Sequence, residues 1–301
     1  MNTATSDKFA VFILTHGRPN KVVTFSSLRR QGYTGEIYII IDNEDKDADE
    51  YRSIYGDKVI VFDKLAISKT FDEGDNFGDR RAVIYARNAS FGIARDLGLD
   101  YFLQLDDDYT SFIHKLTAAL EYKERPVKNL DALFDAMLDY YKSIDALSIA
   151  MAQNGDFLGG AKTTTLDKLW LKRKCMNTFF CSTNRPFQFI GRINEDVNAY
   201  THLGNKGALM FTVFNVAIIQ QQTQGSAGGM TEMYLDTGTY IKSFYPVMYT
   251  PSCVTIYEMG DKHKRLHHKI NWNTAVPCIV SDEYRKAAPV LVNSEITVSD
   301  G

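Results

Sequence analysis

The chain has 301 residues, of which 45% are hydrophobic and 24% are charged. These fractions exclude collagen-like, low-complexity and intrinsically disordered proteins, because enough apolar material is present to offset the entropy lost on folding. The 34 basic and 37 acidic residues give a net charge of -3, which argues against a protein that coats nucleic acid. The charge is uneven, however. Residues 1–110 carry 14 Lys and Arg against 19 Asp and Glu, whereas residues 111–301 carry 20 against 18.

Signals for export or membrane insertion are not visible. Residues 1–9 are polar, and no long apolar run follows them, so we expect no signal peptide and no membrane contact. The cysteines show no C-x-x-C spacing, which predicts buried thiols rather than disulfides or a zinc site. We therefore expect a cytoplasmic protein. The cysteines are Cys175, Cys181, Cys253 and Cys278.

Short apolar runs alternate with helical patterns along the first half of the chain. The runs at residues 9–14, 36–41, 57–62 and 101–105 are apolar at nearly every position, as in strands that are covered on both faces. Helices are predicted at residues 21–30, 85–97 and 129–143, and a further strand at 145–151. The pattern predicts an α/β fold with a mainly parallel central sheet flanked by helices.

Polar residues follow three of these predicted strands. Thr15-His16-Gly17-Arg18 follows the first, Asp42 ends the second, and Asp106-Asp107-Asp108 ends the strand at 101–105. Ligands of parallel sheets bind beyond the carboxyl ends of the strands, so these groups predict a binding crevice at one edge.

The run Asp106-Asp107-Asp108 is the strongest of these features. Three adjacent carboxylates repel one another, and a hard divalent cation such as Mg²⁺ or Mn²⁺ would offset that repulsion. In an extended segment the side chains of Asp106 and Asp108 lie on the same side and could share one metal that bridges a diphosphate. An acidic turn after a strand is the simpler alternative.

Asp42, Arg87 and Asn88 each have more than one interpretation. Asp42 could accept hydrogen bonds from a base or a ribose, although the acidic loop that it opens is typical of a solvated surface. Arg87 could pair with phosphate or with the aspartate run, and Asn88 beside it could cap a helix.

A second acidic pair lies in the back half. Glu195-Asp196 stands at the predicted start of a helix that ends near Gly204. Carboxylates are favoured in a first helical turn by the helix dipole, which is one interpretation. The other is that one carboxylate deprotonates an acceptor hydroxyl.

Two basic clusters also lie in the back half. The first, at residues 262–270, contains His263, His267 and His268, and it lacks the H-E-x-x-H pattern of a zinc protease. The second, Lys168 to Lys174, interleaves basic and aromatic residues. Each cluster is either a solvated surface or a set of groups that hold phosphate, and the histidines could also hold metal.

The order of these motifs resembles that of a glycosyltransferase of the GT-A fold. A Thr-x-Gly-Arg-Pro loop, a strand that ends in Asp, an Arg-Asn helix and a strand into Asp-Asp-Asp follow one another over residues 9–110. The resemblance implies that Asp106 and Asp108 hold the Mn²⁺ or Mg²⁺ of a nucleotide-sugar, with His268 or His267 completing the metal site. It implies nucleotide contacts near the same edge. It also implies that one acid of the Glu-Asp pair is the general base, with Asp196 preferred to Glu195. The expected donor-binding residues are Thr15, Arg18, Asp42, Arg87 and Asp107.

The back half resembles the TET-associated glycosyltransferases, which are linked to phages and modify hydroxymethylated pyrimidines in DNA. Relative to the family form Gly-Arg-Glu-Asp-Val-Asp, Ile193-Asn194 is inserted and Asn198 replaces the last Asp, so both acids stay candidates for the base. The segments that carry this resemblance are Gly191 to Val197, Gly228 to Thr231, Gly238 to Ser243 and His267 to Trp272.

The resemblance implies one domain over residues 1–301, with a nucleotide-sugar-binding half at 1–110 and an acceptor and catalytic half at 111–301. It implies a metal-dependent enzyme that moves a sugar from a nucleotide diphosphate-sugar to a hydroxymethylated pyrimidine such as hydroxymethylcytosine in DNA, in the host cytoplasm if phage-encoded. Two alternatives stay open: transfer to a glycan or small molecule, and a sugar-nucleotide-binding module without catalysis. The acidic excess of residues 1–110 fits a half whose carboxylates are neutralised by metal and nucleotide. The basic clusters lie in residues 111–301, the half that would bind DNA.

Overall fold

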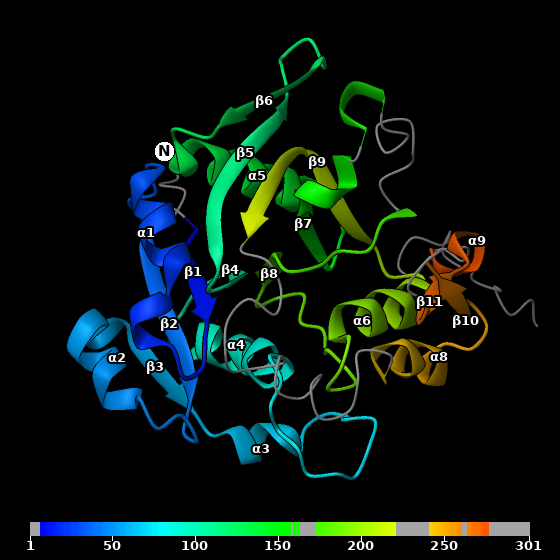
Figure 1. Cartoon of the computed structure of the whole chain (residues 1–301). Coiled ribbons are helices and arrows are strands. Elements are labelled where there is room, and N and C mark those ends of the chain that lie inside the picture. Colours follow the sequence, from blue (N-terminus) through cyan, green and yellow to red (C-terminus); the bar gives the residue numbers. More distant parts are fainter. Residues whose placement is uncertain (1–6, 158, 163–171, 221–240, 261–263, 277–301) are drawn as a thin grey trace, which may run out of the picture.

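The computed structural model of the chain describes residues 7–157, 159–162, 172–220, 241–260 and 264–276 (Figure 1). Its main feature is a nine-stranded sheet, which has the strand order β3-β2-β1-β4-β8-β7-β9-β5-β6. The strands are β1 (Phe9–Leu14), β2 (Glu36–Asp42), β3 (Val59–Phe62), β4 (Tyr101–Asp106), β5 (Tyr109–Leu116), β6 (Tyr122–Pro126), β7 (Ser148–Gln153), β8 (Phe179–Ser182) and β9 (Met210–Gln220).

Most strands of this sheet point the same way. β3, β2, β1 and β4 are parallel neighbours, and β7 is parallel to β9, whereas β8 and β5 run antiparallel to the strands beside them. The main helices are α1 (Val23–Arg30), α2 (Ala48–Tyr55), α3 (Lys64–Ser68), α4 (Ile84–Asp96), α5 (Leu130–Ser143) and α6 (Glu195–Gly204).

The helices cover both faces of the sheet because successive strand residues point to opposite sides. Val11 and Ile13 of β1 pack on one face with Leu28 of α1, Tyr51 of α2 and Phe134 of α5. On the other face, residues of α4 and α6 pack against Ala10, Phe12 and Leu14 of β1. The predicted α/β fold, with a mainly parallel sheet flanked by helices, is confirmed.

Two predicted boundaries differ from the structure. The first helix begins with a 3₁₀ turn, η1 (Pro19–Lys21), before α1, as the fixed φ of a proline at a first helical position allows. The strand predicted at 145–151 is β7, which starts at Ser148. Just before this start, the carbonyl groups of Ile144 and Leu147 accept hydrogen bonds from the side chains of Arg185 and Tyr141, respectively.

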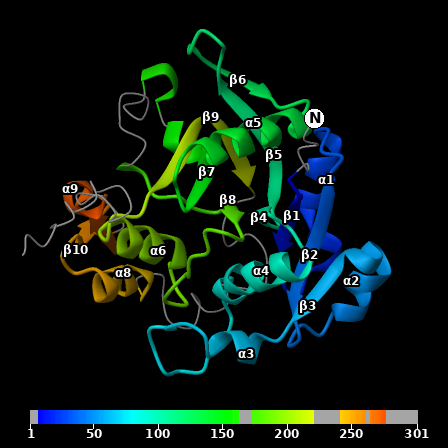
Figure 2. The same ribbon diagram turned by 180° about the vertical axis from the view of Figure 1, so that it is seen from behind.

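The chain after β9 forms a separate group of small elements. It contains η6 (Ile241–Ser243), α8 (Phe244–Tyr249), the antiparallel pair β10 (Val254–Met259) and β11 (Arg265–Ile270), and α9 (Trp272–Ala275). In Figures 1 and 2 this group lies beside α6, at the end of the molecule away from α2 and β3.

Among the residues described, no helix is both long and apolar enough to cross a membrane. Cys175, Cys181 and Cys253 are buried free thiols, as predicted, and Cys278 lies outside the described residues.

Candidate active site

The three aspartates at the end of β4 point to different partners. Asp106 is the last residue of the strand, and Asp107 and Asp108 form the turn into β5. The extended segment expected from the sequence is therefore wrong, because the chain reverses direction within two residues. Asp106 pairs with Arg87, Asp107 pairs with Arg18, and Asp108 makes no ion pair with any described residue.

Arg87 joins the two acidic motifs. It lies in α4 with only 2% of its surface exposed, and its guanidinium carbon is 4.9 Å from the centre of the Phe179 ring. Its Nη2 donates to Oδ1 of Asp106 at 2.9 Å, and its Nε donates to Oε1 of Glu195 at 3.0 Å. Burial disfavours the charge, but the two carboxylates outweigh burial and raise the pKa of Arg87. Arg87 was expected to pair with phosphate or with the aspartate run, and the structure shows its ion pair with the aspartate run.

Asn88 has a different role from the predicted cap. α4 starts at Ile84, so Asn88 lies inside the helix, and its side chain pairs with the backbone N–H and C=O of Phe189. It therefore ties α4 to the chain that leads to α6.

Glu195 and Asp196 are the first two residues of α6, which confirms the predicted helix. Their carboxylates diverge. Glu195 faces Arg87, whereas Oδ2 of Asp196 lies 3.7 Å from Nζ of Lys174 and its Oδ1 accepts from the N–H of Val197. Burial raises the pKa of Glu195 against the pull of Arg87, and the charges of Asp196 and Asp106 add to that rise. The side chains are 12% and 13% exposed, so both acids lie in a partly dry environment.

The loop before α6 explains the departures from the family form. Asn194 has a left-handed backbone, with φ of 63°, a conformation that asparagine tolerates better than most residues. Asn198 is fully buried, and its Nδ2 donates to the carbonyl oxygens of Ile190 and Ile193 at 3.0 Å each. An aspartate has no N–H to donate, so this loop needs the amide.

Asp107 anchors the loop that follows β1. Its Oδ2 accepts from Oγ1 of Thr15 at 2.5 Å and lies 3.2 Å from Nε of Arg18. Tyr51 supports the same loop, because its hydroxyl lies 3.0 Å from Oγ1 of Thr15 and accepts from the backbone N–H of Arg18. Thr15 and Asp107 are buried, whereas Arg18 keeps 26% of its side chain exposed. Arg18 is thus the member of this group that reaches solvent.

Asp42 is also buried, and it contacts a histidine and a lysine. Its Oδ2 accepts from Nδ1 of His16 at 2.8 Å and from Nζ of Lys64 at 3.1 Å. Burial opposes the charge of Asp42, but the hydrogen bond from His16 and the charge of Lys64 prevail and lower its pKa. His16 is 43% exposed, and its hydrogen bond to Asp42 raises its pKa. Neither His16, which lies in the loop after β1, nor Lys64 is among the expected donor-binding residues.

His268 lies on β11, next to Asn194 of the loop before α6. It is 9% exposed on β11, stacks on His267 with 4.4 Å between ring centres, and has Nδ1 3.4 Å from Nδ2 of Asn194. Burial, together with Lys174 and other nearby cations, lowers its pKa to about 3. Among the described residues, no three His, Cys, Asp or Glu side chains form a group that could hold a metal, so Asp106, Asp108 and His268 do not meet as a ligand set.

Asp106 and Asp108 by themselves suit a metal that also binds phosphate. Burial and the charges of Asp106 and Asp107 raise the pKa of Asp108 to about 7, against the smaller opposing effect of Arg18. Mg²⁺ commonly takes one or two carboxylates and completes its shell with water and substrate phosphates. The two aspartates fit that ion without a third protein ligand.

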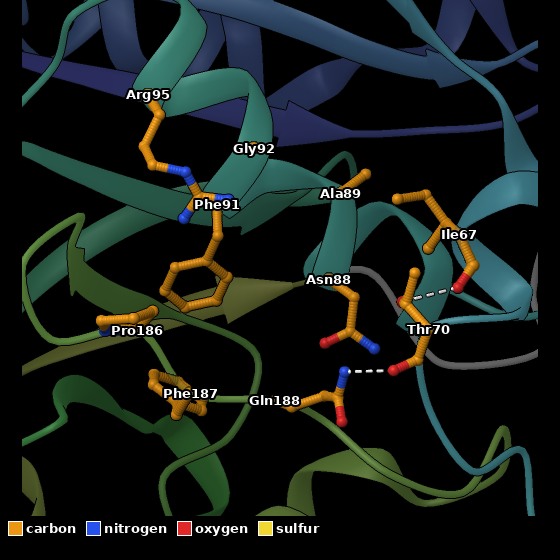
Figure 3. Close-up of a pocket in the computed structure, with 10 residues that line it drawn as sticks. All are labelled: Ile67, Thr70, Asn88, Ala89, Phe91, Gly92, Arg95, Pro186, Phe187 and Gln188. Atoms are coloured by element: carbon orange, nitrogen blue, oxygen red, sulfur yellow. Dashed lines mark hydrogen bonds between the residues drawn. The ribbon is translucent and has the colours of Figure 1, made fainter.

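A cavity of about 560 Å³ lies between α4, the end of α3 and residues 186–188 (Figure 3). Phe91 of α4 and Phe187 line it, and Gln188 donates a hydrogen bond to the carbonyl of Thr70 at its rim. None of the predicted site residues lines it, so it is separate from the site.

Several predicted segments lie outside the described residues. They are Lys168 to Leu171 of one basic cluster, His263 of the other, and the motif segments Gly228 to Thr231 and Gly238 to Tyr240.

The sequence profile of one glycosyltransferase family matches residues 9–229, which is more than half of the chain. The chain belongs to the TET-associated glycosyltransferase family. No curated protein matches the chain in sequence.

Similar solved structures have low sequence identity. Staphylococcus aureus TarS is 14% identical with a TM-score of 0.41 over 70% of this chain, and the chain spans only 36% of TarS. The glucosyl-3-phosphoglycerate synthase of Mycobacterium tuberculosis is 10% identical over 88% of this chain and 87% of its own, with a TM-score of 0.46. The mannosyltransferase PcManGT of Pyrobaculum calidifontis is 9% identical over 83% of this chain and 75% of its own, with a TM-score of 0.45.

Proposed function

We propose that the protein transfers a sugar from a nucleotide diphosphate-sugar to the hydroxymethyl group of a modified pyrimidine in DNA, with a divalent metal. The observation that carries this proposal is the buried Arg87, which joins Asp106 at the end of β4 to Glu195 at the start of α6. It holds a group suited to a donor diphosphate next to a group suited to an acceptor hydroxyl. Family membership supports the sugar transfer, and the family's name supports the modified DNA base.

The donor would bind at the carboxyl ends of β1, β2 and β4. His16 and Arg18 are partly exposed side chains in the loop after β1, and the buried residues Asp42, Thr15 and Asp107 contact that loop. We assign Asp42 and Asp107 an indirect role on this basis, because their carboxylates are already occupied.

Asp106 and Asp108 would hold Mg²⁺ or Mn²⁺. When bound, the ion would neutralise negative charge on the leaving diphosphate. The unpaired carboxylate of Asp108 supports this assignment.

Asp196 is the proposed general base. It would accept the proton of the hydroxymethyl group while that oxygen bonds to the anomeric carbon and the nucleoside diphosphate leaves. Glu195 is a weaker candidate, because its carboxylate is tied to Arg87 at 3.0 Å, whereas Lys174 is 3.7 Å from Asp196.

The test is to incubate the protein with hydroxymethylated DNA, plain DNA, a panel of nucleotide-sugars and Mn²⁺, then digest the DNA and weigh the nucleosides. A mass gain of one sugar on the modified base alone is the expected result. Donor hydrolysis or transfer to a small hydroxylated acceptor, without any mass gain on modified DNA, would instead identify a glycan or small-molecule transferase. Donor binding without turnover would identify a binding module.

A further inference from the structure

Three neutral amide side chains lie at the sheet edge that carries Asp106. β8 is antiparallel to both β4 and β7, so β4 and β7 run in the same direction, and β9 is parallel to β7. The carboxyl ends of these strands therefore share one edge, where β7 ends in Gln153 and β9 ends in Gln220. Asn177, shortly before β8, is the third amide. This is the edge at which ligands of parallel sheets bind.

The three amides are joined to one another by hydrogen bonds. Nδ2 of Asn177 donates to Oε1 of Gln153 at 3.2 Å and to Oε1 of Gln220 at 2.8 Å. The hydroxyl of the buried Tyr109 donates to the backbone carbonyl of Asn177 at 2.7 Å. Asn177 has a left-handed backbone, with φ of 64°. That conformation costs free energy and persists where the surrounding contacts hold it, so these hydrogen bonds fix the amide of Asn177 in one orientation.

Part of the hydrogen-bonding capacity of this amide cluster is unused. Oδ1 of Asn177 and Nε2 of Gln220 have no hydrogen-bond partner among the described residues. Both side chains are half-buried and neither atom is fully covered, so a ligand can reach them. A matching ligand must donate to the first atom and accept from the second. A hydroxyl group does both, whereas the oxygens of an ionised phosphate or carboxylate only accept.

The amide cluster lies close to the proposed metal site. Gln220 at the end of β9 is the ladder partner of Tyr109 at the start of β5 (Figure 1), and Tyr109 directly follows Asp108. Paired Cα atoms of antiparallel strands are about 5 Å apart and successive Cα atoms about 3.8 Å, so the Cα atoms of Gln220 and Asp108 lie within about 10 Å of each other.

The same cluster is connected to the proposed base. Nζ of Lys174 is 3.7 Å from Oδ2 of Asp196, and Lys174 precedes Asn177 by three residues, a stretch that spans at most about 11 Å. A ligand on the amides is therefore near both the metal site and the base. The transferred sugar is the part of the donor that must lie there, because its anomeric carbon is bonded to the diphosphate and is attacked by the acceptor oxygen.

We propose that Nε2 of Gln220 and Oδ1 of Asn177 bind hydroxyl groups of the sugar that the donor carries, and that Gln153 holds Asn177 in place. This inference rests on the positions given above to the metal and the base, and it does not depend on the DNA acceptor. A site that hydrogen-bonds a hydroxyl discriminates against analogues that lack it. The two amides therefore contribute to the choice of sugar and not to the affinity for the nucleotide.

The test compares the binding of nucleotide-sugars and of bare nucleoside diphosphates by titration calorimetry with Mn²⁺ present. The probes are UDP-glucose, UDP-galactose, UDP-N-acetylglucosamine and GDP-mannose, each compared with UDP or GDP. Gln220→Leu removes the amide at similar volume, and Asn177→Gly removes the amide while it permits the left-handed backbone. Gln188→Leu, at an exposed glutamine that lines the separate cavity beside α4, is the matched control.

Wild type should bind at least one nucleotide-sugar more tightly than the bare diphosphate. Gln220→Leu and Asn177→Gly should each weaken the binding of that nucleotide-sugar about three- to tenfold, which is typical of a lost neutral hydrogen bond. Their Kd for the bare diphosphate should not change, which also shows that the variants are folded. One deoxy analogue of the sugar should bind wild type more weakly by a similar factor and lose nothing further in the variant that removes its partner.

Different failures have different meanings. If the variants weaken the nucleotide-sugar and the bare diphosphate equally, or if wild type binds no nucleotide-sugar more tightly than the bare diphosphate, the sugar site is wrong. Unchanged donor binding with a raised KM for hydroxymethylated DNA would assign the amides to the acceptor, which overturns this inference while the proposed function stands. If the variants lose the preference for the sugar but wild type modifies no DNA, the sugar site stands and the proposed acceptor fails.

Discussion

Arg87 donates a hydrogen bond from Nη2 to Oδ1 of Asp106 at 2.9 Å, across a sequence separation of 19 residues. The guanidinium is buried between aromatic rings, and its Nε holds Glu195 from the other half of the chain. The two acidic motifs that the sequence presents separately thus share one cation.

Substitution of Arg87 should destabilise the protein and abolish transfer. In Arg87→Met the carboxylates of Asp106 and Glu195 lose their shared cation, so the free energy of unfolding should fall by about 3–5 kcal/mol, as for other broken buried ion pairs. Urea unfolding followed by circular dichroism measures this. Arg52→Met, at an exposed pair with Asp49, is the control and should change stability by less than about 1 kcal/mol. Equal losses in the two variants would contradict the bridging role.

The metal assignment predicts a thermal shift that depends on Asp108. Mn²⁺ or Mg²⁺ with a nucleoside diphosphate should raise the Tm of wild type, since a ligand that binds only the folded state stabilises it. Asp108→Asn and Asp106→Asn should lose most of that shift. Asp100→Asn is the control, because this aspartate precedes β4 and is not a proposed metal ligand, and it should keep the rise in Tm. A full shift in Asp108→Asn would remove this residue from the metal site.

The two acids of α6 should respond differently to amide substitution. Asp196→Asn should lower kcat by about 10²–10⁴-fold, the usual contribution of a general base, with KM for the donor little changed. Glu195→Gln retains an oxygen that can accept a hydrogen bond from Arg87, so its kcat should fall less than tenfold. This corresponds to a rise of less than about 1.4 kcal/mol in the activation free energy. The reverse order, measured by product mass under single-turnover conditions, would move the base to Glu195.

The His16–Asp42 pair predicts a stability difference that depends on pH. The pKa of His16 is raised in the folded state, so its stabilising effect is full below the unfolded pKa of about 6.5 and is lost as pH rises through the folded pKa. His16→Gln should therefore cost more stability at pH 6 than at pH 9. The difference should stay below about 1 kcal/mol, because His16 is 43% exposed and solvent screens the pair. Unfolding curves at the two pH values measure it, and a cost that grows with pH would refute the pairing.

The segment after α3 should position the loop before α6, which leads to the proposed base. Oδ2 of Asp75 accepts from Nε of the buried Arg192 at 2.6 Å and also from the hydroxyl of Tyr245, and the carbonyl of Glu73 accepts from the N–H of Arg192 at 2.9 Å. Asp75→Ala should lower stability by about 1–3 kcal/mol and should lower kcat more than it raises KM for the donor.

Asp75→Asn, which can still accept a hydrogen bond, should restore part of kcat. If Asp75→Ala lost stability but kept kcat, Asp75 would be structural only.

The sequence allowed the fold and much of the site to be predicted. Apolar runs with covered faces predicted the parallel strands, and the helix at Glu195 followed from acids in a first turn and a glycine at its end. Prediction was poorer where a side chain replaces a backbone partner. Arg185 and Tyr141 hydrogen-bond carbonyl groups just before β7, and the side chain of Asn88 pairs with Phe189, 101 residues away.

The sequence by itself determined which residue types stand at the ends of the strands, because strand period and helix signals are local. Only the tertiary structure decided how those residues are used. It showed Asp42 and Asp107 buried in ion pairs, His16 and Arg18 partly exposed, and, among the described residues, no metal-binding group that joins His268 to the aspartate run. The physical reason is that a carboxylate's role depends on which cations surround it and on its exposure, and both depend on contacts between residues distant in the chain.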